Sequence, residues 1–512
     1  THGAMDSGSD ACFEQIKAWI NDCVEQHSIC KQPEFTALPS RVIDVGPLDG
    51  SQEPKLVETK GLFGKYLTLS HCWGGSQPIK TVRDTLEENK RCILWSSIPK
   101  TFQDAITITR RLELQYLWID SLCIIQDDTT DWELESANMA AIYENSLLTI
   151  SASLAANANQ GCFSLRDPPY EVHGLGPNGQ QYSVLVRKLM SHDDLSVNAA
   201  RWAYESGIPL LDRAWAYQER LLATRIVHFL PRELFWECKD ALRCECAEYI
   251  PPSSTNSRDF IQLALKIWPM IVSEYSARSL TFRKDRLPAL SGVAKRMEEK
   301  TNSAKYMAGI WSNHLPTALL WQIKYHHSTP EPPGRRDWHP DGQAPSWSWA
   351  SIEGEGIYIK YRVGDLEESS VQILDVNIVP AGIDPTGAIK LGRITLRGMV
   401  ATAALHYYTS SKTGRGSATI YQLRKNDLVC HIYPDTPLSD GEDFLPHGYL
   451  LSCLRFGTVH KIDTRALILR QSRYFPDLYE RVGEMCFQDH DQAHIQAKSW
   501  FRNAKEIEIT IV

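Results

Sequence analysis

The stretch YLWIDSLCIIQDDTTDWELESANMAAIYENSLLTIS, residues 116–151, indicates the fold of the chain. It opens with an apolar run that ends on Asp120. This is the pattern of a buried parallel strand whose carboxyl end opens onto a ligand crevice. An acidic loop, a short helix and a second apolar strand over residues 147–151 follow. The segment therefore predicts a strand–helix–strand unit of an α/β sheet, with the loop lining the crevice.

The sequence before this stretch extends the same alternation. Residues 66–70, YLTLS, form an apolar run that is followed by HCWGG. A serine and an early proline at Ser97 and Pro99 are typical of a helix start, and that helix leads into residue 116. Alternating strands and helices predict a mainly parallel sheet flanked by helices. The strands at residues 66–70, 116–120 and 147–151 should therefore lie in one sheet.

The chain divides into four segments by pattern. We expect an N-terminal leader helix and strand over residues 10–60, the α/β core over 61–250, a helical connector over 251–343 and a β-rich domain over 344–512. The last segment contains many short runs typical of strands, which favours antiparallel pairing. The fold class is therefore α/β with a β-rich C-terminal domain.

Composition excludes several classes of protein. The 512 residues are 43% hydrophobic and 23% charged, as in an ordinary globular chain of two or three domains. A net charge of −8 provides no basic field for nucleic acid. No apolar run approaches the roughly 20 residues that span a bilayer, and no secretory signal is evident. We expect a cytoplasmic protein with no nucleic-acid or membrane partner, and the opening THGAM is expected to be an expression remnant.

Five sequence blocks, in order, carry a resemblance to a known family. They are YLTLSHCWGG at 66–75, IPKTFQDAI at 98–106, YLWIDSLCIIQDD at 116–128, DWELESANMAAIY at 131–143 and DRAWAYQERLLATR at 212–225. Together they resemble the fungal heterokaryon incompatibility (HET) domain proteins. Three shorter similarities extend the resemblance outside this core: WINDCVEQHSIC at 19–30, LPALSGVA at 287–294 and APSWSWAS at 344–351.

The resemblance implies a fold and a role. The family core is similar to TIR domains, some of which cleave NAD with a glutamate on a helix beside the sheet. It implies a TIR-like core, a part in non-self recognition and cell death, and hydrolysis of NAD or a related nucleotide as the candidate activity. Two alternatives stay open. One is a tailoring enzyme of fungal secondary metabolism that uses His71 and Asp120 as acid and base, and the other is a non-catalytic signalling module that self-associates.

Glu135 is the leading catalytic candidate. At about 100° per residue it falls on the apolar side of its helix, whereas Glu133 points to the opposite side. An inward carboxylate should have a raised pKa or pair with a cation, for which Arg213 and Arg220 are the candidates. One such carboxylate suffices to steady an oxocarbenium-like transition state, because nicotinamide is already a good leaving group.

Other residues at the crevice complete the candidate site. Asp120 ranks second as a catalytic group, and His71 third. Trp73 offers an aromatic face to a nicotinamide or adenine ring, although core packing explains it equally well. The candidates for substrate binding are Ser70, Trp73, Gly74, Cys123, Gln126 and Arg213. Neither GxGxxG nor a P-loop is evident, so a dehydrogenase cradle and a phosphate-transfer loop are not supported.

Cysteines raise a separate question about metal. The chain has thirteen, and free thiols are expected in preference to a disulfide framework. Cys23, His27 and Cys30 have C-x3-H-x2-C spacing, and a second cluster of Cys238, Cys244 and Cys246 lies downstream. A structural zinc site requires that the two segments meet. The simpler alternative is a set of free buried cysteines, and no metal or cofactor is expected at the crevice.

Overall fold

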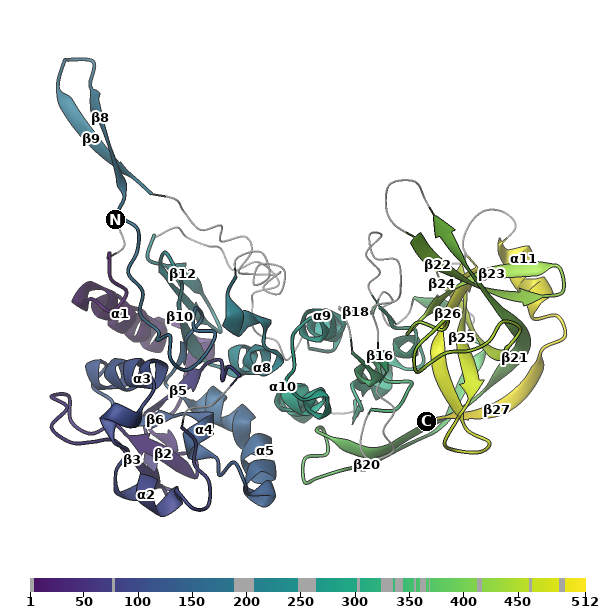
Figure 1. The fold of residues 1–512 in the computed structure, drawn as a ribbon, viewed down its shortest axis with the longest axis horizontal. Helices are drawn as coiled ribbons and strands as arrows, with labels where there is room; N and C mark the ends of the chain where they lie inside the picture. Colours follow the sequence, from purple (N-terminus) through teal and green to yellow (C-terminus); the bar gives the residue numbers. More distant parts are fainter. Residues whose placement is uncertain are drawn as a thin grey trace. The chain divides into compact units, whose positions relative to one another are not determined.

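The structure is a computed structural model that describes residues 4–75, 79–187, 207–246, 264–301, 304–323, 335–336, 344–353, 356–359, 365–367, 369–411, 417–459, 463–487 and 493–512. The chain folds into two compact units, Thr1–Phe260 and Ile261–Val512, which are coloured purple to teal and teal to yellow in Figure 1. The predicted leader and α/β core fall in the first unit. Most of the predicted connector and all of the β-rich segment fall in the second.

An eight-stranded mixed sheet forms the centre of the first unit. Its order is β12-β11-β10-β7-β5-β6-β2-β3. The strands are β2 (Arg41–Asp44), β3 (Lys55–Glu58), β5 (Tyr66–Ser70), β6 (Tyr116–Trp118), β7 (Leu148–Ser151), β10 (Arg225–Phe229), β11 (Leu234–Cys238) and β12 (Leu242–Cys244). The three strands expected in one sheet, β5, β6 and β7, are neighbours and run parallel, which confirms that prediction.

The sheet as a whole is less parallel than predicted. β10, β7, β5 and β6 pair in parallel, whereas β2, β3, β11 and β12 join the edges antiparallel. The prediction of a mainly parallel sheet is therefore wrong beyond its centre. Short turns join β10 to β11 and β11 to β12, and such turns can connect only antiparallel neighbours. β2 and β3 are also consecutive and antiparallel, but a longer connection, residues 45–54, joins them.

Helices cover the central strands. β5 and β7 are buried along their whole length, as expected for parallel strands with both faces covered. The helices of this region are α2 (Leu86–Arg91), α3 (Lys100–Arg111), α4 (Asp120–Cys123), α5 (Thr129–Asn145) and α8 (Ala214–Leu222). The carboxylate of Asp128 caps α5 by accepting from the N–H groups of Thr130 and Asp131. α5 packs beside α8.

The leader packs against the antiparallel edge of the sheet. Helix α1 (Asp10–Gln26) is capped by the Ser9 side chain and is followed by the 3-10 turn η1 (Ser28–Cys30). The rings of Trp19 on α1 and Trp236 on β11 lie 6.0 Å apart. Two further pairs of strands stand outside the main sheet: β1 (Thr36–Ala37) with β4 (Phe63–Gly64), and the hairpin of β8 (Tyr170–Leu175) with β9 (Gln181–Val186).

The second unit begins with helices and short strand pairs. Its elements up to residue 358 are α9 (Ala264–Ser276), α10 (Pro288–Lys300), β13 (Tyr306–Met307), β14 (Ile310–Trp311), β15 (Gln322–Ile323), β16 (Arg335–Arg336), β17 (Ile352–Glu353) and β18 (Ile357–Tyr358). The short strands pair as β13 with β14, β15 with β18 and β16 with β17, each pair antiparallel. The helical segment expected here is thus interrupted by strands.

A nine-stranded sheet makes up the rest of the second unit. It contains β19 (Leu366–Glu367), β20 (Val371–Pro380), β21 (Ile389–Ser411), β22 (Ser417–Lys425), β23 (Leu428–Pro434), β24 (Leu450–Val459), β25 (Asp463–Gln471), β26 (Tyr479–Phe487) and β27 (Lys505–Ile511), with helix α11 (Ala493–Trp500) between the last two. The long strand β21 pairs with both β22 and β24 and so closes six strands into a ring.

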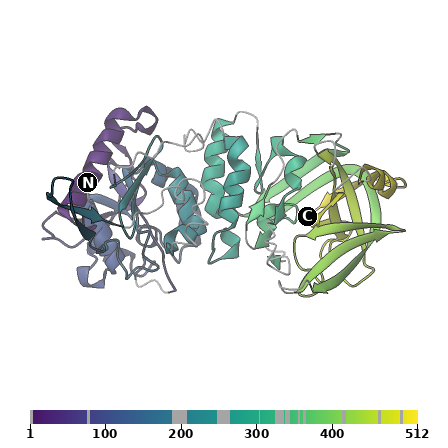
Figure 2. The same ribbon diagram turned by 90° about the horizontal axis from the view of Figure 1, so that it is seen from above.

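The curved strands of this ring are visible from above in Figure 2. Apolar side chains, including Trp500 of α11, fill a core cluster among its strands. All pairings in the sheet are antiparallel except that of β26 with β27. The prediction of a β-rich, antiparallel C-terminal region is confirmed. Within the described ranges, no helix combines the length and the apolar character needed to cross a bilayer.

Candidate functional site

The order of the parallel strands points to one edge of the sheet. Along the chain, β5, β6, β7 and β10 are the first to fourth parallel strands, and they lie in the sheet as β6-β5-β7-β10. The order therefore reverses between β5 and β7. In open α/β sheets, ligands bind outside the carboxyl ends of the strands at such a reversal. Ser70 and Ser151 end the two strands and are register partners, so they mark this position.

Glu219, on α8, lies at this position. The Ser70 hydroxyl donates a hydrogen bond to Oε2 of Glu219, and the glutamate is only 4% exposed. Burial, with a smaller contribution from the nearby Asp120, raises the pKa of Glu219 to about 7, although the Ser70 hydroxyl and Arg213 oppose the shift. A carboxyl that changes charge near neutral pH is suited to general acid–base chemistry.

Asp120 and His71 lie next to this glutamate. Asp120 follows β6, and its Oδ2 accepts a hydrogen bond from the Trp73 indole N–H at 2.7 Å. Its Oδ1 lies 3.8 Å from Nδ1 of His71, which follows β5. Two side chains of the loop after β5 thus face the Asp120 carboxyl at the carboxyl edge of the sheet, and Trp73 hydrogen-bonds it.

His71 is buried and neutral near pH 7. Its ring packs edge-on against Phe102 with the centroids 4.9 Å apart. Burial lowers the pKa of His71 to about 4, and the charge of Asp120 only partly offsets this effect. The Nε2 atom is buried and makes no hydrogen bond to any residue that the structure describes. A neutral imidazole of this kind can accept or relay a proton.

Arg213 fixes the loop that carries His71. It occupies the position just before α8, and its guanidinium donates to the backbone carbonyl of His71. The Tyr143 hydroxyl, from α5, donates to the carbonyl of Leu69 at 3.3 Å. Five of the predicted site residues are therefore brought together around Glu219: Ser70, His71, Trp73, Asp120 and Arg213.

Glu135 belongs to a different polar group. It is 1% exposed, which confirms that it faces inward, and Glu133 is less buried. Its nearest cation is Arg41, whose Nη2 lies 3.9 Å from Oε1 of Glu135 and 2.5 Å from the Asp131 carboxylate. Burial raises the pKa of Glu135, and Arg41 works against that rise. The carboxyl therefore shares a cation with a second acid.

The cation partners expected for Glu135 were wrong. Arg213 bonds the carbonyl of His71, and Arg220 pairs with Glu237 on β11. Both arginines lie on or beside α8, where other acceptors engage them, while Arg41 comes from β2. The pairing depends on how β2 joins the sheet beside β6, which spacing along the chain does not reveal.

Three further predicted residues have local structural explanations. Cys123 is fully buried, and burial raises the pKa of its thiol to about 12, so it is not a nucleophile at neutral pH. The Gln126 amide donates to the carbonyls of Asp120 and Ile124 at 3.2 and 3.1 Å. Gly74 has a φ of +74°, and a Cβ there would lie 2.5 Å from the Cβ of Asn157. Contact of these three with a ligand stays a prediction.

Two residues of the site, Glu219 and Tyr143, were absent from the predicted set. Glu219 lies three residues after Ala216 and three before Leu222, and all three are buried. This spacing places them on one face of a helix, so it was the available signal. The same spacing also fits a polar residue that only fastens the helix to the sheet, so the sequence favours no catalytic role for it.

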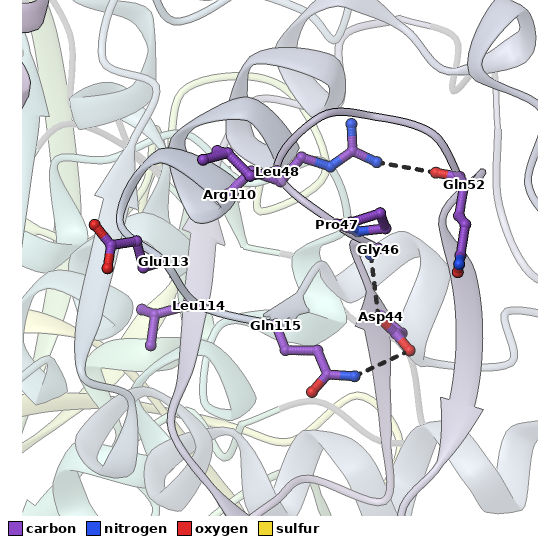
Figure 3. A pocket seen from close by; sticks show the side chains of 9 residues that line it. All are labelled: Asp44, Gly46, Pro47, Leu48, Gln52, Arg110, Glu113, Leu114 and Gln115. Atoms are coloured by element: carbon purple, nitrogen blue, oxygen red, sulfur yellow. Dashed lines mark hydrogen bonds between the residues drawn. The ribbon is translucent and has the colours of Figure 1, made fainter.

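A pocket of about 430 Å³ opens at the other end of the parallel strands. Figure 3 shows its lining: Asp44, Gly46, Pro47, Leu48, Gln52, Arg110, Glu113, Leu114 and Gln115. Within it, Arg110 donates to the Gln52 carbonyl at 3.2 Å and Gln115 donates to Asp44 at 3.3 Å. Residues 114 and 115 precede β6, so the pocket lies away from the acid–base groups that follow β5 and β6. It is therefore a weaker candidate for chemistry.

Comparison with known proteins gives one match. Residues 66–219 match the family model described as heterokaryon incompatibility protein (HET). No curated protein and no solved structure matches the chain. The matched segment begins at the first residue of β5 and ends at Glu219, so it contains both the Glu219 group and Glu135.

Proposed function

We propose that the segment matching the heterokaryon incompatibility model, residues 66–219, is a hydrolase that cleaves the N-glycosidic bond of NAD or a related nucleotide, with Glu219 as its acid–base group. The protein would then act in non-self recognition and cell death. The observation that supports this proposal most directly is the position of Glu219. It is a buried carboxyl with a pKa of about 7, and it lies where the order of the parallel strands reverses.

The chemistry requires few groups. Loss of nicotinamide leaves positive charge on the ribose, and a nearby carboxylate stabilises that charge. Asp120, which is oriented by Trp73 and by the N–H of Ser121, is suited to this role. Glu219 in its ionised form accepts a proton from the attacking water. Arg213 supplies positive charge at the same edge, as a nucleotide phosphate would require.

A second candidate function rests on His71. Its neutral imidazole, with an unbonded Nε2 and with Asp120 at 3.8 Å from Nδ1, resembles an acid–base pair for a small metabolite. Such a pair would serve a tailoring enzyme of secondary metabolism. A catalytic role for Glu135 also stays a prediction, since Glu135 lies within the same matched segment.

The test begins with substrate. Purified protein is incubated with NAD, and separately with a panel of nucleotides and small fungal metabolites, and products are separated by liquid chromatography. We expect release of nicotinamide from NAD. Conversion of a metabolite without release of nicotinamide would support the tailoring enzyme. The absence of any product would support the non-catalytic module.

Variants then test which buried glutamate is catalytic. Glu219→Gln should lower turnover by about 10² to 10⁴-fold, because the amide keeps the shape but cannot transfer the proton. Glu484→Gln is the matched control, since Glu484 is a buried glutamate of the second unit whose pKa is also raised by burial. Retained turnover in Glu219→Gln, together with loss in Glu135→Gln, would transfer the catalytic role to Glu135.

A further inference from the structure

Four side chains with metal-binding atoms meet at the junction of the leader and the sheet. They are Cys23 in the last turn of α1, His27 at its end, Cys30 in η1 and Cys238 at the end of β11. Their ligand atoms all lie within 4.8 Å of one another, and none of the four is more than 8% exposed. A tetrahedral zinc site with Zn–S bonds of about 2.3 Å has sulfur atoms about 3.8 Å apart. The observed cluster would therefore need only a small contraction to reach the geometry of a zinc site.

Cys238 is the fourth candidate ligand, which the spacing of Cys23, His27 and Cys30 alone did not identify. The two segments meet, but the other two downstream cysteines do not join, because Cys244 and Cys246 are bonded to one another as a disulfide. This disulfide departs from the expectation of free thiols, which holds for the other eleven cysteines. The cluster is thus a closed set of three sulfurs and one imidazole.

The imidazole of His27 is oriented as a metal ligand would be. Its Nδ1 faces the sulfurs and lies 3.2 Å from Sγ of Cys238. Its other nitrogen, Nε2, lies 3.7 Å from a carboxylate oxygen of Asp240. Metal-binding histidines usually have such a carboxylate on the outer nitrogen, where it fixes the tautomer and the ring orientation.

Charge gives an independent argument. Arg225 is 1% exposed, and its Nε donates to Sγ of Cys23 at 3.2 Å while Nη2 donates to the Cys30 carbonyl at 2.7 Å. It forms no salt bridge with an acidic residue in the described ranges, although an unbalanced buried charge is costly. Three thiolates, a neutral imidazole and Zn²⁺ sum to −1. Zinc at the cluster would therefore balance Arg225.

We propose that Cys23, His27, Cys30 and Cys238 bind one structural zinc ion. All four tetrahedral positions are filled by protein, so the ion has no open position for substrate and serves stability. The N–H of Ala241 donates to Sγ of Cys238 at 3.2 Å, which stabilises a thiolate there. The ion ties the end of α1 to β11, two elements far apart in sequence. All four ligands lie outside residues 66–219.

The first test measures metal in the purified protein. The full chain is prepared without chelators and analysed for metals by plasma mass spectrometry, with about one equivalent of zinc expected for a single four-ligand site. Cobalt substitution should give the visible absorption bands of a tetrahedral site with thiolate ligands. Folded protein with no bound metal, or with a disulfide among Cys23, Cys30 and Cys238 by intact mass, would overturn the proposal.

Variants locate the ion. Cys238→Ser should lose the zinc, and Cys453→Ser is the control because Cys453 is also a fully buried free cysteine. Should Cys238→Ser fail to fold, Asp240→Asn keeps every ligand and changes a half-exposed side chain. It should release zinc to a competing chelator at about 10 to 100-fold lower chelator concentration. Equal release by Asp240→Asn and the unmodified protein, or zinc retained by Cys238→Ser, would place the ion elsewhere.

Discussion

Glu219 and Glu135 are both buried glutamates on neighbouring helices, yet their surroundings differ. Glu135 shares the Arg41 guanidinium with Asp131, so its group contains two acids and one cation. Glu219 instead accepts a hydrogen bond from the Ser70 hydroxyl at the carboxyl edge of the sheet. Burial raises the pKa of both carboxyls, but it brings that of Glu219 to about 7. Burial alone therefore does not distinguish these two carboxyls, whereas the identity of their partners does.

The largest effect should come from removing the cation beside Glu135. Arg41→Met leaves the buried Glu135 and the partly buried Asp131 without a counter-charge, so we expect the free energy of unfolding to fall by about 3 to 5 kcal/mol. Chemical denaturation of the first unit measures this change. Arg83→Met is the control, because Arg83 forms a more exposed ion pair with Asp128 at 3.0 Å and its loss should cost less than about 1 kcal/mol. Equal effects in the two variants would remove the structural assignment of the Arg41 group.

The next effect concerns pH. The folded pKa of Glu219 lies above the ordinary 4.5, so the folded state binds its proton more tightly than the unfolded state does. That contribution to stability is complete below pH 4.5 and is lost as the pH rises to about 7. At about 1.4 kcal/mol for each pH unit, the loss amounts to about 3 kcal/mol.

Comparison with Glu219→Gln isolates this contribution. The difference in unfolding free energy between the unmodified protein and the variant should decrease between pH 4.5 and about 7 and stay constant above. The opposite dependence of His71, whose lowered pKa costs stability as the pH falls from 6.5 to about 4, is present in both proteins and cancels. A flat difference would mean that Glu219 is ionised throughout.

A smaller effect should follow from removing the donor to Glu219. Ser70→Ala takes away a hydrogen bond to a carboxyl, so we expect a loss of about 1.5 to 3 kcal/mol near neutral pH. Because this hydrogen bond lowers the pKa of Glu219, the midpoint of its titration should move above 7 in the variant. Carbon-13 NMR of labelled glutamate side chains measures the midpoint. A downward movement would contradict the assigned direction of the hydrogen bond.

The smallest effect should come from Trp73→Phe. The ring remains apolar, but the 2.7 Å hydrogen bond to Asp120 is lost, at a cost of about 1 kcal/mol. If Trp73 also stacks on a bound ring, KM for NAD should rise while kcat changes less. A fall in kcat with constant KM would instead indicate that Trp73 acts only by orienting Asp120.

Local pattern was sufficient for part of this structure. The apolar runs of β5, β6 and β7 predicted one parallel group, and helical periodicity predicted that Glu135 faces inward. The partners were not predictable, because Arg41 comes from the antiparallel strand beside β6 and Cys238 from a distant hairpin. Glu219 was missed for the same reason. Helical spacing places Glu219 on the buried face of α8, but its position at the ends of β5 and β7 follows from how α8 packs, which spacing along the chain does not reveal.

The antiparallel edges of the first unit also decide how this chain can be dissected. Residues 66–219 contain β5, β6 and β7, while their neighbours β2 and β10 lie outside. A fragment cut to those residues would expose one bare backbone edge on β6 and another on β7, and such edges pair with other chains. We expect that fragment to aggregate. A fragment from Ser9 to Cys246 keeps every strand of the eight-stranded sheet, and we expect this longer fragment to stay in solution.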